Sequence, residues 1–238
     1  MASDDDDIEH IIAGHRRYRQ TRKQDREFYE SLASRQQRPR MLWIGCADSR
    51  VIPTQITGAD PGALFVIRNI ANIVPPAGSG DDSVGAAIEY CVIHLGVDDI
   101  VICGHSGCGG VKALGEEISE EREGHLKRWV EFARPALERA GIDDFEPARD
   151  ALKAIQANVL VQRDHLLTYP SVRETFDSGG LRLHCWLFDM ESGDLLAYDD
   201  ESQDWGPLTS RAETQRRRSW LRRMFGAGAD TEPTPRGT

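Results

Sequence analysis

The chain has 238 residues and a formal net charge of -10, so it is long enough for one sizeable α/β core, and its acidic balance argues against nucleic-acid binding by the whole molecule. No run approaches the roughly 20 apolar residues of a membrane helix, and the beginning of the chain lacks a signal-peptide stretch. Five cysteines in a chain of this size do not make a disulfide framework. We therefore expect a soluble protein of the reducing cytoplasm.

An acidic start and a helical arm are predicted over residues 1–36. Residues 1–7 are rich in aspartate and are expected to be disordered, because they have nothing to bury. From Ile8 to about Ser34, apolar residues recur at broadly helical intervals among many charges, which predicts one or two amphipathic helices.

Residues 37–204 alternate strand-like and helix-like segments, which is typical of a parallel sheet with right-handed crossovers. Strands are predicted at Arg40–Gly45, Ala63–Ile67 and Asp99–Cys103, and an edge hairpin at Leu181–Met190 with Leu195–Tyr198. Helices are predicted at Val84–Leu95, capped by Ser83, at Val111–Leu114, within residues 116–147, and at Ala148–Leu167, where Tyr169-Pro170 ends the helix. We expect an α/β domain with about four parallel strands and an antiparallel edge strand, flanked by helices.

Two polar motifs follow predicted strands. Cys46-Ala47-Asp48-Ser49-Arg50 ends the first, and His105-Ser106-Gly107-Cys108 ends the third. The carboxyl ends of adjacent strands are the usual site position in an open α/β sheet. Two thiolates and an imidazole suit zinc and leave its fourth position open, which is a catalytic arrangement. Taken singly, each motif has a simpler explanation: a buried cysteine before a surface ion pair, and a structural histidine.

Together these motifs resemble the β-class carbonic anhydrases. The matching segments are Cys46 to Val51, Phe65 to Asn72, Gly85 to Tyr90 and Gly104 to Gly110, within a resemblance from about Gln37 to Leu114 that continues thinly through Leu181 to Asp199. The resemblance implies one zinc ion per chain, held by Cys46, His105 and Cys108. It also implies reversible hydration of carbon dioxide to bicarbonate and a proton, with zinc hydroxide as the nucleophile.

The resemblance assigns further roles by position. Asp48 accepts the hydrogen of the zinc hydroxide and aims it, Arg50 keeps Asp48 ionised, and release of Arg50 would let Asp48 become the fourth zinc ligand. The substrate residues would be Gln37, which donates toward bicarbonate, the apolar pocket residues Phe65, Ile70 and Tyr90, and Gly109, a small backbone near the metal. From composition alone these are a surface glutamine and ordinary core residues. The family also implies a homodimer or larger homo-oligomer, in which a neighbouring subunit completes the pocket and the N-terminal arm wraps the partner; the alternative is an arm packed on its own domain.

One position bears on regulation. Some family members close the site when bicarbonate enters a pocket of tryptophan, arginine and tyrosine; Trp43 and Arg68 match two of these, and Phe188 stands at the third. Because phenylalanine lacks the donor hydroxyl, we expect a site that stays open.

Residues 205–238 are predicted to form a basic C-terminal helix and a disordered end. Trp220, Leu221, Met224 and Phe225 fall on one helical face among arginines, a pattern typical of docking on a partner protein or an anionic membrane surface, or of a helix packed on the dimer. Two rival functions stay open: hydrolysis of carbonyl sulfide or carbon disulfide at the same site, and a non-catalytic zinc protein that senses bicarbonate or serves an assembly. The Asp48–Arg50 pair argues against the last, because a structural zinc site more often has a fourth Cys or His ligand.

Overall fold

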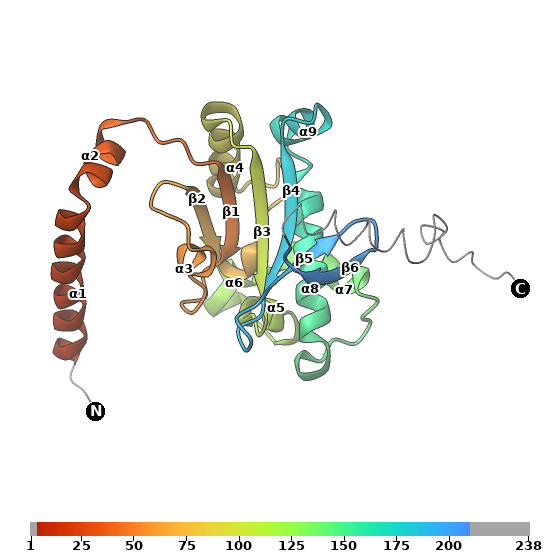
Figure 1. Cartoon of the computed structure of the whole chain (residues 1–238). Coiled ribbons are helices and arrows are strands. Elements are labelled where there is room, and N and C mark those ends of the chain that lie inside the picture. The colour runs from red at the N-terminus through yellow and green to blue at the C-terminus, as the bar shows by residue number, and fades with distance from the viewer. Residues whose placement is uncertain (1–3, 210–238) are drawn as a thin grey trace, which may run out of the picture.

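The computed structural model describes residues 4–209, and their six strands form one sheet in the order β2-β1-β3-β4-β5-β6 (Figure 1). The strands are β1 (Met41–Cys46), β2 (Leu64–Asn69), β3 (Asp99–His105), β4 (Arg182–Phe188), β5 (Leu195–Asp199) and β6 (Asp204–Pro207). The strands β1 to β4 run parallel, whereas β5 is antiparallel to β4 and β6 is antiparallel to β5. The predicted mostly parallel α/β fold is confirmed, with one more antiparallel strand than expected.

The strand order reverses at β1, which has β2 on one side and β3 on the other. The carboxyl ends of the two strands at such a reversal leave a crevice, the common ligand position in open α/β sheets. The central strands β1 and β3 are almost entirely buried, which explains why their sequences are continuous apolar runs. The end of β1 and the end of β3 are therefore held side by side by a rigid core.

Helices and short helical turns connect the strands. They are α1 (Asp4–Gln24), α2 (Arg26–Ser34), α3 (Pro53–Thr57), η1 (Ile70–Asn72), α4 (Asp82–Glu89), η2 (Tyr90–Leu95), α5 (Gly109–Lys112), η3 (Ala113–Gly115), α6 (Glu120–Val130), η4 (Glu131–Ala133), α7 (Pro135–Arg139), α8 (Pro147–Leu166) and α9 (Pro170–Asp177). The helices α4, α8 and α9 bury one face of the sheet through apolar side chains such as Ile88, Leu166 and Val172. The opposite face carries a smaller apolar cluster around Trp43, Val101 and Cys103.

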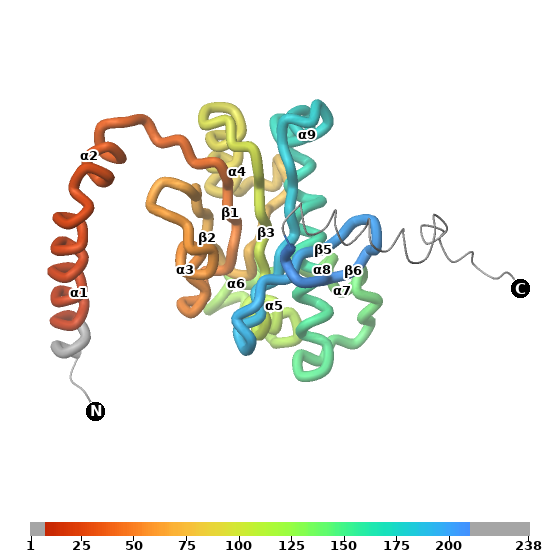
Figure 2. Tube along the Cα trace, viewed as in Figure 1, coloured from red at the N-terminus to blue at the C-terminus, as the bar shows by residue number. Residues whose placement is uncertain are grey.

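The N-terminal arm, α1 and α2, lies beside the sheet and joins β1 through an extended segment (Figures 1 and 2). Most of its large apolar side chains, among them Ile11, Tyr18 and Phe28, are exposed in the single chain. None of the helices in the described part of the chain is long and apolar enough to cross a bilayer.

Three local predictions were wrong. The aspartate run is already helical from Asp4, since acidic residues suit the positive end of a helix dipole. The cap of α4 is Asp81, whose carboxylate accepts from the Val84 N–H, and not Ser83. The predicted end of the preceding helix before Tyr169-Pro170 is confirmed, since α8 ends at Leu166, but Pro170 also begins a helix that was not predicted, because proline has no N–H to lose in a first turn. The boundary at residue 204 falls inside β6, so residues 204–207 belong to the sheet and not to a C-terminal helix. The remainder of the predicted basic tail, residues 210–238, lies outside the described residues.

Candidate metal centre

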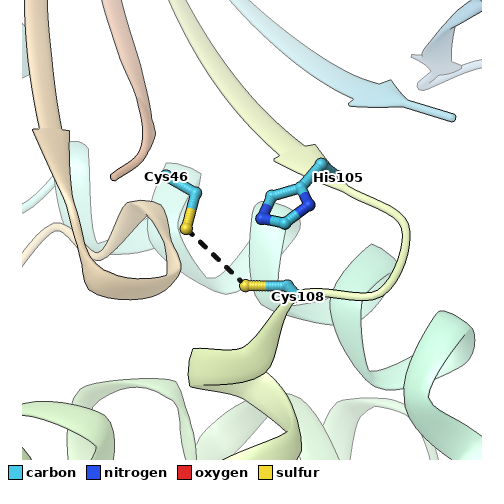
Figure 3. A group of neighbouring side chains, drawn as sticks. All are labelled: Cys46, His105 and Cys108. Carbon is cyan, nitrogen blue, oxygen red and sulfur yellow. Dashed lines mark hydrogen bonds between the residues drawn. The ribbon is translucent and has the colours of Figure 1, made fainter. Parts of the chain in front are cut away.

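Three buried side chains converge where β1 and β3 end (Figure 3). Cys46 is the last residue of β1, His105 is the last residue of β3, and Cys108 immediately precedes α5. Their ligand atoms all lie within 4.8 Å of one another. The structure thus brings together the three residues that the two sequence motifs supplied.

The spacing and hydrogen bonding of this group fit zinc. The Cys46 and Cys108 sulfur atoms are 3.9 Å apart, which is far beyond a disulfide bond of about 2.05 Å. Two sulfur ligands about 2.3 Å from one tetrahedral zinc ion lie roughly 3.8 Å apart. His105 Nδ1 is 3.0 Å from the Ser106 carbonyl oxygen, and because a carbonyl only accepts, this nitrogen carries the proton. His105 Nε2 is then an acceptor, buried and without any hydrogen-bond partner, which is the state a metal ligand requires.

The two sulfur atoms share a proton and are surrounded by backbone donors. The hydrogen bond between the two sulfur atoms, together with the N–H groups of Asp48 and Ala71 that face Cys46, lowers the pKa of Cys46 from 9.0 to about 4. The same bond raises the pKa of Cys108, whose sulfur also faces the N–H groups of Gly110 and Val111. A cation would displace the shared proton and leave two thiolates.

Asp48 and Arg50 form the pair that the motif predicted. Arg50 Nε donates to Asp48 Oδ1 at 2.9 Å and Nη2 donates to Oδ2 at 2.7 Å, and the Arg50 backbone N–H also donates to Oδ1 at 3.0 Å. These bonds hold the pKa of Asp48 well below its usual range. Asp48 Oδ2 lies 3.9 Å from His105 Nε2, so the ionised carboxylate borders the ligand group without belonging to it.

The residues matched to the anion pocket have other contacts here. Arg68 Nε donates to the Cys46 carbonyl at 3.0 Å and Nη2 donates to the Asp48 carbonyl at 2.6 Å, so the guanidinium braces the loop that carries both residues. Trp43 is fully buried, with its ring centroid 5.8 Å from that of Trp186, and Phe188 packs against the same cluster.

The predicted substrate residues are dispersed in the single chain. Gln37 is exposed on the segment between α2 and β1. Phe65 and Tyr90 lie near each other, with ring centroids 6.3 Å apart, but Tyr90 is 43% exposed and Ile70 is 41% exposed. Their roles stay predictions.

Gly110, the neighbour of Gly109, makes a close contact within the chain. A Cβ added at Gly109 would meet nothing within 4 Å, whereas one at Gly110 would lie 2.6 Å from Ile70 Cγ2 and 3.0 Å from Ala71 Cβ. Packing against the turn after β2 therefore requires glycine at position 110, and the role of Gly109 near the metal stays a prediction.

Comparisons with known proteins identify the family. A family model described as "Carbonic anhydrase" matches residues 41–195. The solved structure entitled "The structure of the beta-carbonic anhydrase CcaA" superposes with a TM-score of 0.81 at 34% identity, covering 87% of this chain and 94% of that one. The chain belongs to the β-carbonic anhydrase family.

Other members of the family are similar to this chain over most of its length. A protein of Pseudomonas aeruginosa named carbonic anhydrase is 39% identical over 192 residues, which is 79% of this chain and 86% of that protein. A structure of the tetrameric β-carbonic anhydrases of Sordaria macrospora has a TM-score of 0.70 at 34% identity, covering 81% of this chain and 96% of that one.

The sequence reasoning matched residues up to Asn72 to the family and gave Ile70 a pocket role, but it gave no role to Ala71 of the turn after β2, although Ala71 packs in one buried cluster with Cys46. Ala71 and Asn72 in this turn both have positive φ, at 61° and 49°. A sequence signal existed: the polar residues Asn158 and Gln162 are four apart on an otherwise apolar face of α8, and both contact this turn.

Proposed function

We propose that this chain is a zinc-dependent carbonic anhydrase that interconverts carbon dioxide and water with bicarbonate and a proton, with one zinc ion per chain. The observation that carries the proposal is the unpartnered His105 Nε2, buried beside the Cys46 and Cys108 sulfur atoms and 3.9 Å from a carboxylate oxygen of Asp48. A purely structural zinc site would more often present a fourth cysteine or histidine at that place.

The residues of the chain have distinct tasks in this proposal. Cys46, His105 and Cys108 would hold the metal, which when bound would act as a Lewis acid and make a nucleophile available from water near neutral pH. Asp48 Oδ2 accepts a hydrogen bond from the reacting water and so sets its orientation toward the carbon of the substrate. Arg50 holds Asp48 from both carboxylate oxygens, which keeps the carboxylate ionised and turned away from direct metal coordination.

A second copy of the chain is proposed to complete the substrate pocket. Ile70 and Tyr90 are each more than two-fifths exposed, which is unusual for the walls of an apolar pocket. The Sordaria macrospora relatives are described as tetrameric, and the exposed apolar side chains of the N-terminal arm offer further surface for such an assembly. In this assembly Phe65, Ile70 and Tyr90 would line the carbon dioxide pocket, and Gln37 and Gly109 would lie near bicarbonate.

We also infer a cytoplasmic location. All five cysteines are free thiols, including the pair that the metal requires as thiolates, and a reducing compartment preserves them.

The test is the rate of carbon dioxide hydration by the zinc-loaded protein, measured by stopped flow with a pH indicator. Cys108→Ser should lose zinc and at least about 1,000-fold in rate, because the metal supplies several kcal/mol of the barrier reduction. Cys91→Ser is the matched control, since Cys91 is also buried but lies outside the ligand group, and it should keep both zinc and rate. Full zinc occupancy without hydration would overturn the proposal, and the same protein would then be assayed for hydrolysis of carbonyl sulfide and carbon disulfide.

A further inference from the structure

The turn after β2, residues 70–74, has a backbone conformation that its sequence does not favour. Ala71 and Asn72 lie in the left-handed region, at φ 61° and 49°. Asparagine tolerates this region, but alanine does so rarely. Both residues are almost completely buried. Such a conformation persists only where its surroundings hold it.

Side chains from distant elements hold the turn in this conformation through hydrogen bonds. Trp129 Nε1 donates to the Ile70 carbonyl at 2.9 Å, Asn158 Nδ2 donates to the Ala71 carbonyl at 3.0 Å, Gln162 Oε1 accepts from the Val74 N–H at 2.8 Å, and His165 Nδ1 donates to the Val74 carbonyl at 2.9 Å. Three of these four side chains come from one face of α8, at spacings of four and three residues.

Asn158 and Gln162 form a connected pair. Gln162 Nε2 donates to Asn158 Oδ1 at 2.9 Å and to the Phe132 carbonyl at 3.1 Å. With the bonds to the turn, the oxygen and the nitrogen of each amide are therefore hydrogen-bonded. Both side chains are fully buried, and buried amides are costly unless every group is paired. Among the described residues, only four polar side chains are buried to this degree: Asn72 of the turn, the pair itself, and the ligand His105.

The held turn lies against the metal centre. Ala71 is buried in one apolar cluster with Cys46 and Cys108, and its N–H faces the Cys46 sulfur. On the other side, a Cβ on Gly110 would lie 3.2 Å from the Ala71 nitrogen, so the turn also packs on the start of α5, directly after Cys108. The position of Ala71 is thereby coupled to both sulfur ligands.

We propose that Asn158 and Gln162 are positioning residues of the metal centre: they hold the 70–74 turn packed against Cys46 and against the start of α5, directly after Cys108. This inference rests on the proposed zinc site. A turn packed on two ligand cysteines fixes the positions of their sulfur atoms and keeps water away from them, and surroundings of this kind affect metal affinity although they never touch the metal.

The experiment compares Asn158→Leu and Gln162→Leu with Val161→Ala in the full chain. Leucine keeps the approximate size of each amide and removes its hydrogen bonds. Val161 is buried on the same helix but packs against Ala136 and Ala140 of the α7 region, so its truncation weakens the packing of α8 without touching the turn. Melting temperature reports the stability cost, zinc affinity is measured by chelator competition, and the sulfur-to-cobalt charge-transfer band of the Co²⁺-loaded protein reports on the thiolates.

We expect Asn158→Leu and Gln162→Leu to weaken zinc binding by about 10- to 100-fold and to shift the charge-transfer band. Val161→Ala should lower the melting temperature while leaving affinity and band unchanged. Adding Ala71→Gly to Asn158→Leu should recover much of the affinity, because glycine adopts the left-handed conformation without a brace.

A merely structural pair would give a different result. The inference is overturned if the leucine variants lose no more zinc affinity than Val161→Ala at equal loss of stability, or if the band stays in place, or if Ala71→Gly restores nothing. These readouts need no carbon dioxide, so a wild-type protein that binds zinc but does not hydrate carbon dioxide would refute the proposed function alone.

Discussion

The metal centre has two flanks that are built in opposite ways. The first, the Asp48–Arg50 pair, is local and open: the partners are two residues apart, and the Arg50 side chain is 63% exposed. The second, the 70–74 turn, is buried and held by α8 residues such as Asn158, which is 87 positions from Ala71. Arg50 opens the first flank to solvent, whereas residues 71–74 of the second flank are buried. We therefore expect the open flank to govern rate and the buried flank to govern metal retention and stability.

Among changes that separate the two flanks, the largest effect should follow from Arg50→Gln, which removes the charge and the bidentate bond. The pKa of Asp48 will rise toward its ordinary value of 3.8, so the carboxylate stays ionised at neutral pH. Its orientation, however, is no longer fixed by Arg50. Misplacement of a positioning group by about 1 Å costs on the order of 100-fold in rate. Stopped-flow hydration should show that loss, with zinc content and melting temperature close to wild type.

Arg50→Lys is the matched control, since lysine keeps the charge but not the planar fork. The hydration rate of Arg50→Lys should lie between those of the wild type and Arg50→Gln. Loss of zinc from either variant would contradict the division between the two flanks.

The ligand Cys46 receives donors from both flanks, and the metal-free protein should show this in its stability. Between about pH 4 and pH 9 the folded pair keeps one proton, because the pKa of Cys46 is about 4 and that of Cys108 is raised, whereas the unfolded chain keeps both protons up to its ordinary pKa of 9.0. Because the unfolded state binds more protons, the pair stabilises the fold increasingly as pH rises through this window and less again above it. Melting temperatures of the metal-free protein should rise from acidic to mildly alkaline pH, and Cys46→Ala should remove that contribution.

A smaller effect is expected from two neighbouring glycines. Gly110→Ala would press a methyl group onto Ile70 and Ala71, so it should destabilise the protein by about 1–3 kcal/mol, in the range of overpacked cores, and weaken zinc binding. Gly109→Ala faces open space and should leave the melting temperature unchanged. Thermal unfolding and zinc affinity are measured for both variants. Equal losses of melting temperature and zinc affinity in Gly109→Ala and Gly110→Ala would mean that the buried flank is not packed as described.

The smallest effect concerns bicarbonate. Phe188 offers no hydroxyl, and the Arg68 guanidinium already donates to the carbonyls of Cys46 and Asp48. We expect the hydration rate to rise with pH through a single titration and to show no abrupt alkaline onset, with or without added bicarbonate. An abrupt onset in the pH–rate profile, together with its removal by moderate changes in bicarbonate, would show that Asp48 closes the site and that the open flank is a switch.

Much of this centre was predictable because its parts are local patterns. Apolar runs that end in Cys46 and His105 predicted two buried strands and a site at their carboxyl ends, and the motif spacing predicted the Asp48–Arg50 bond. The strand β6 and the helix α9 were missed for local reasons as well: β6 is four residues long and carries little pattern, and Pro170 reads equally as the end of one helix or the start of the next.

By itself, the sequence determined the α/β class, the family, the three candidate metal ligands and the Asp48–Arg50 pair, since each depends on residue types at short spacing. Only the tertiary structure decided that Gly110 needs to be glycine, that Arg68 braces the loop after β1, and that Asn158 and Gln162 hold the turn beside Cys46. These contacts join residues that are 20 or more positions apart, and their geometry depends on how α5 and α8 pack on the sheet. No pattern along the chain encodes that packing directly.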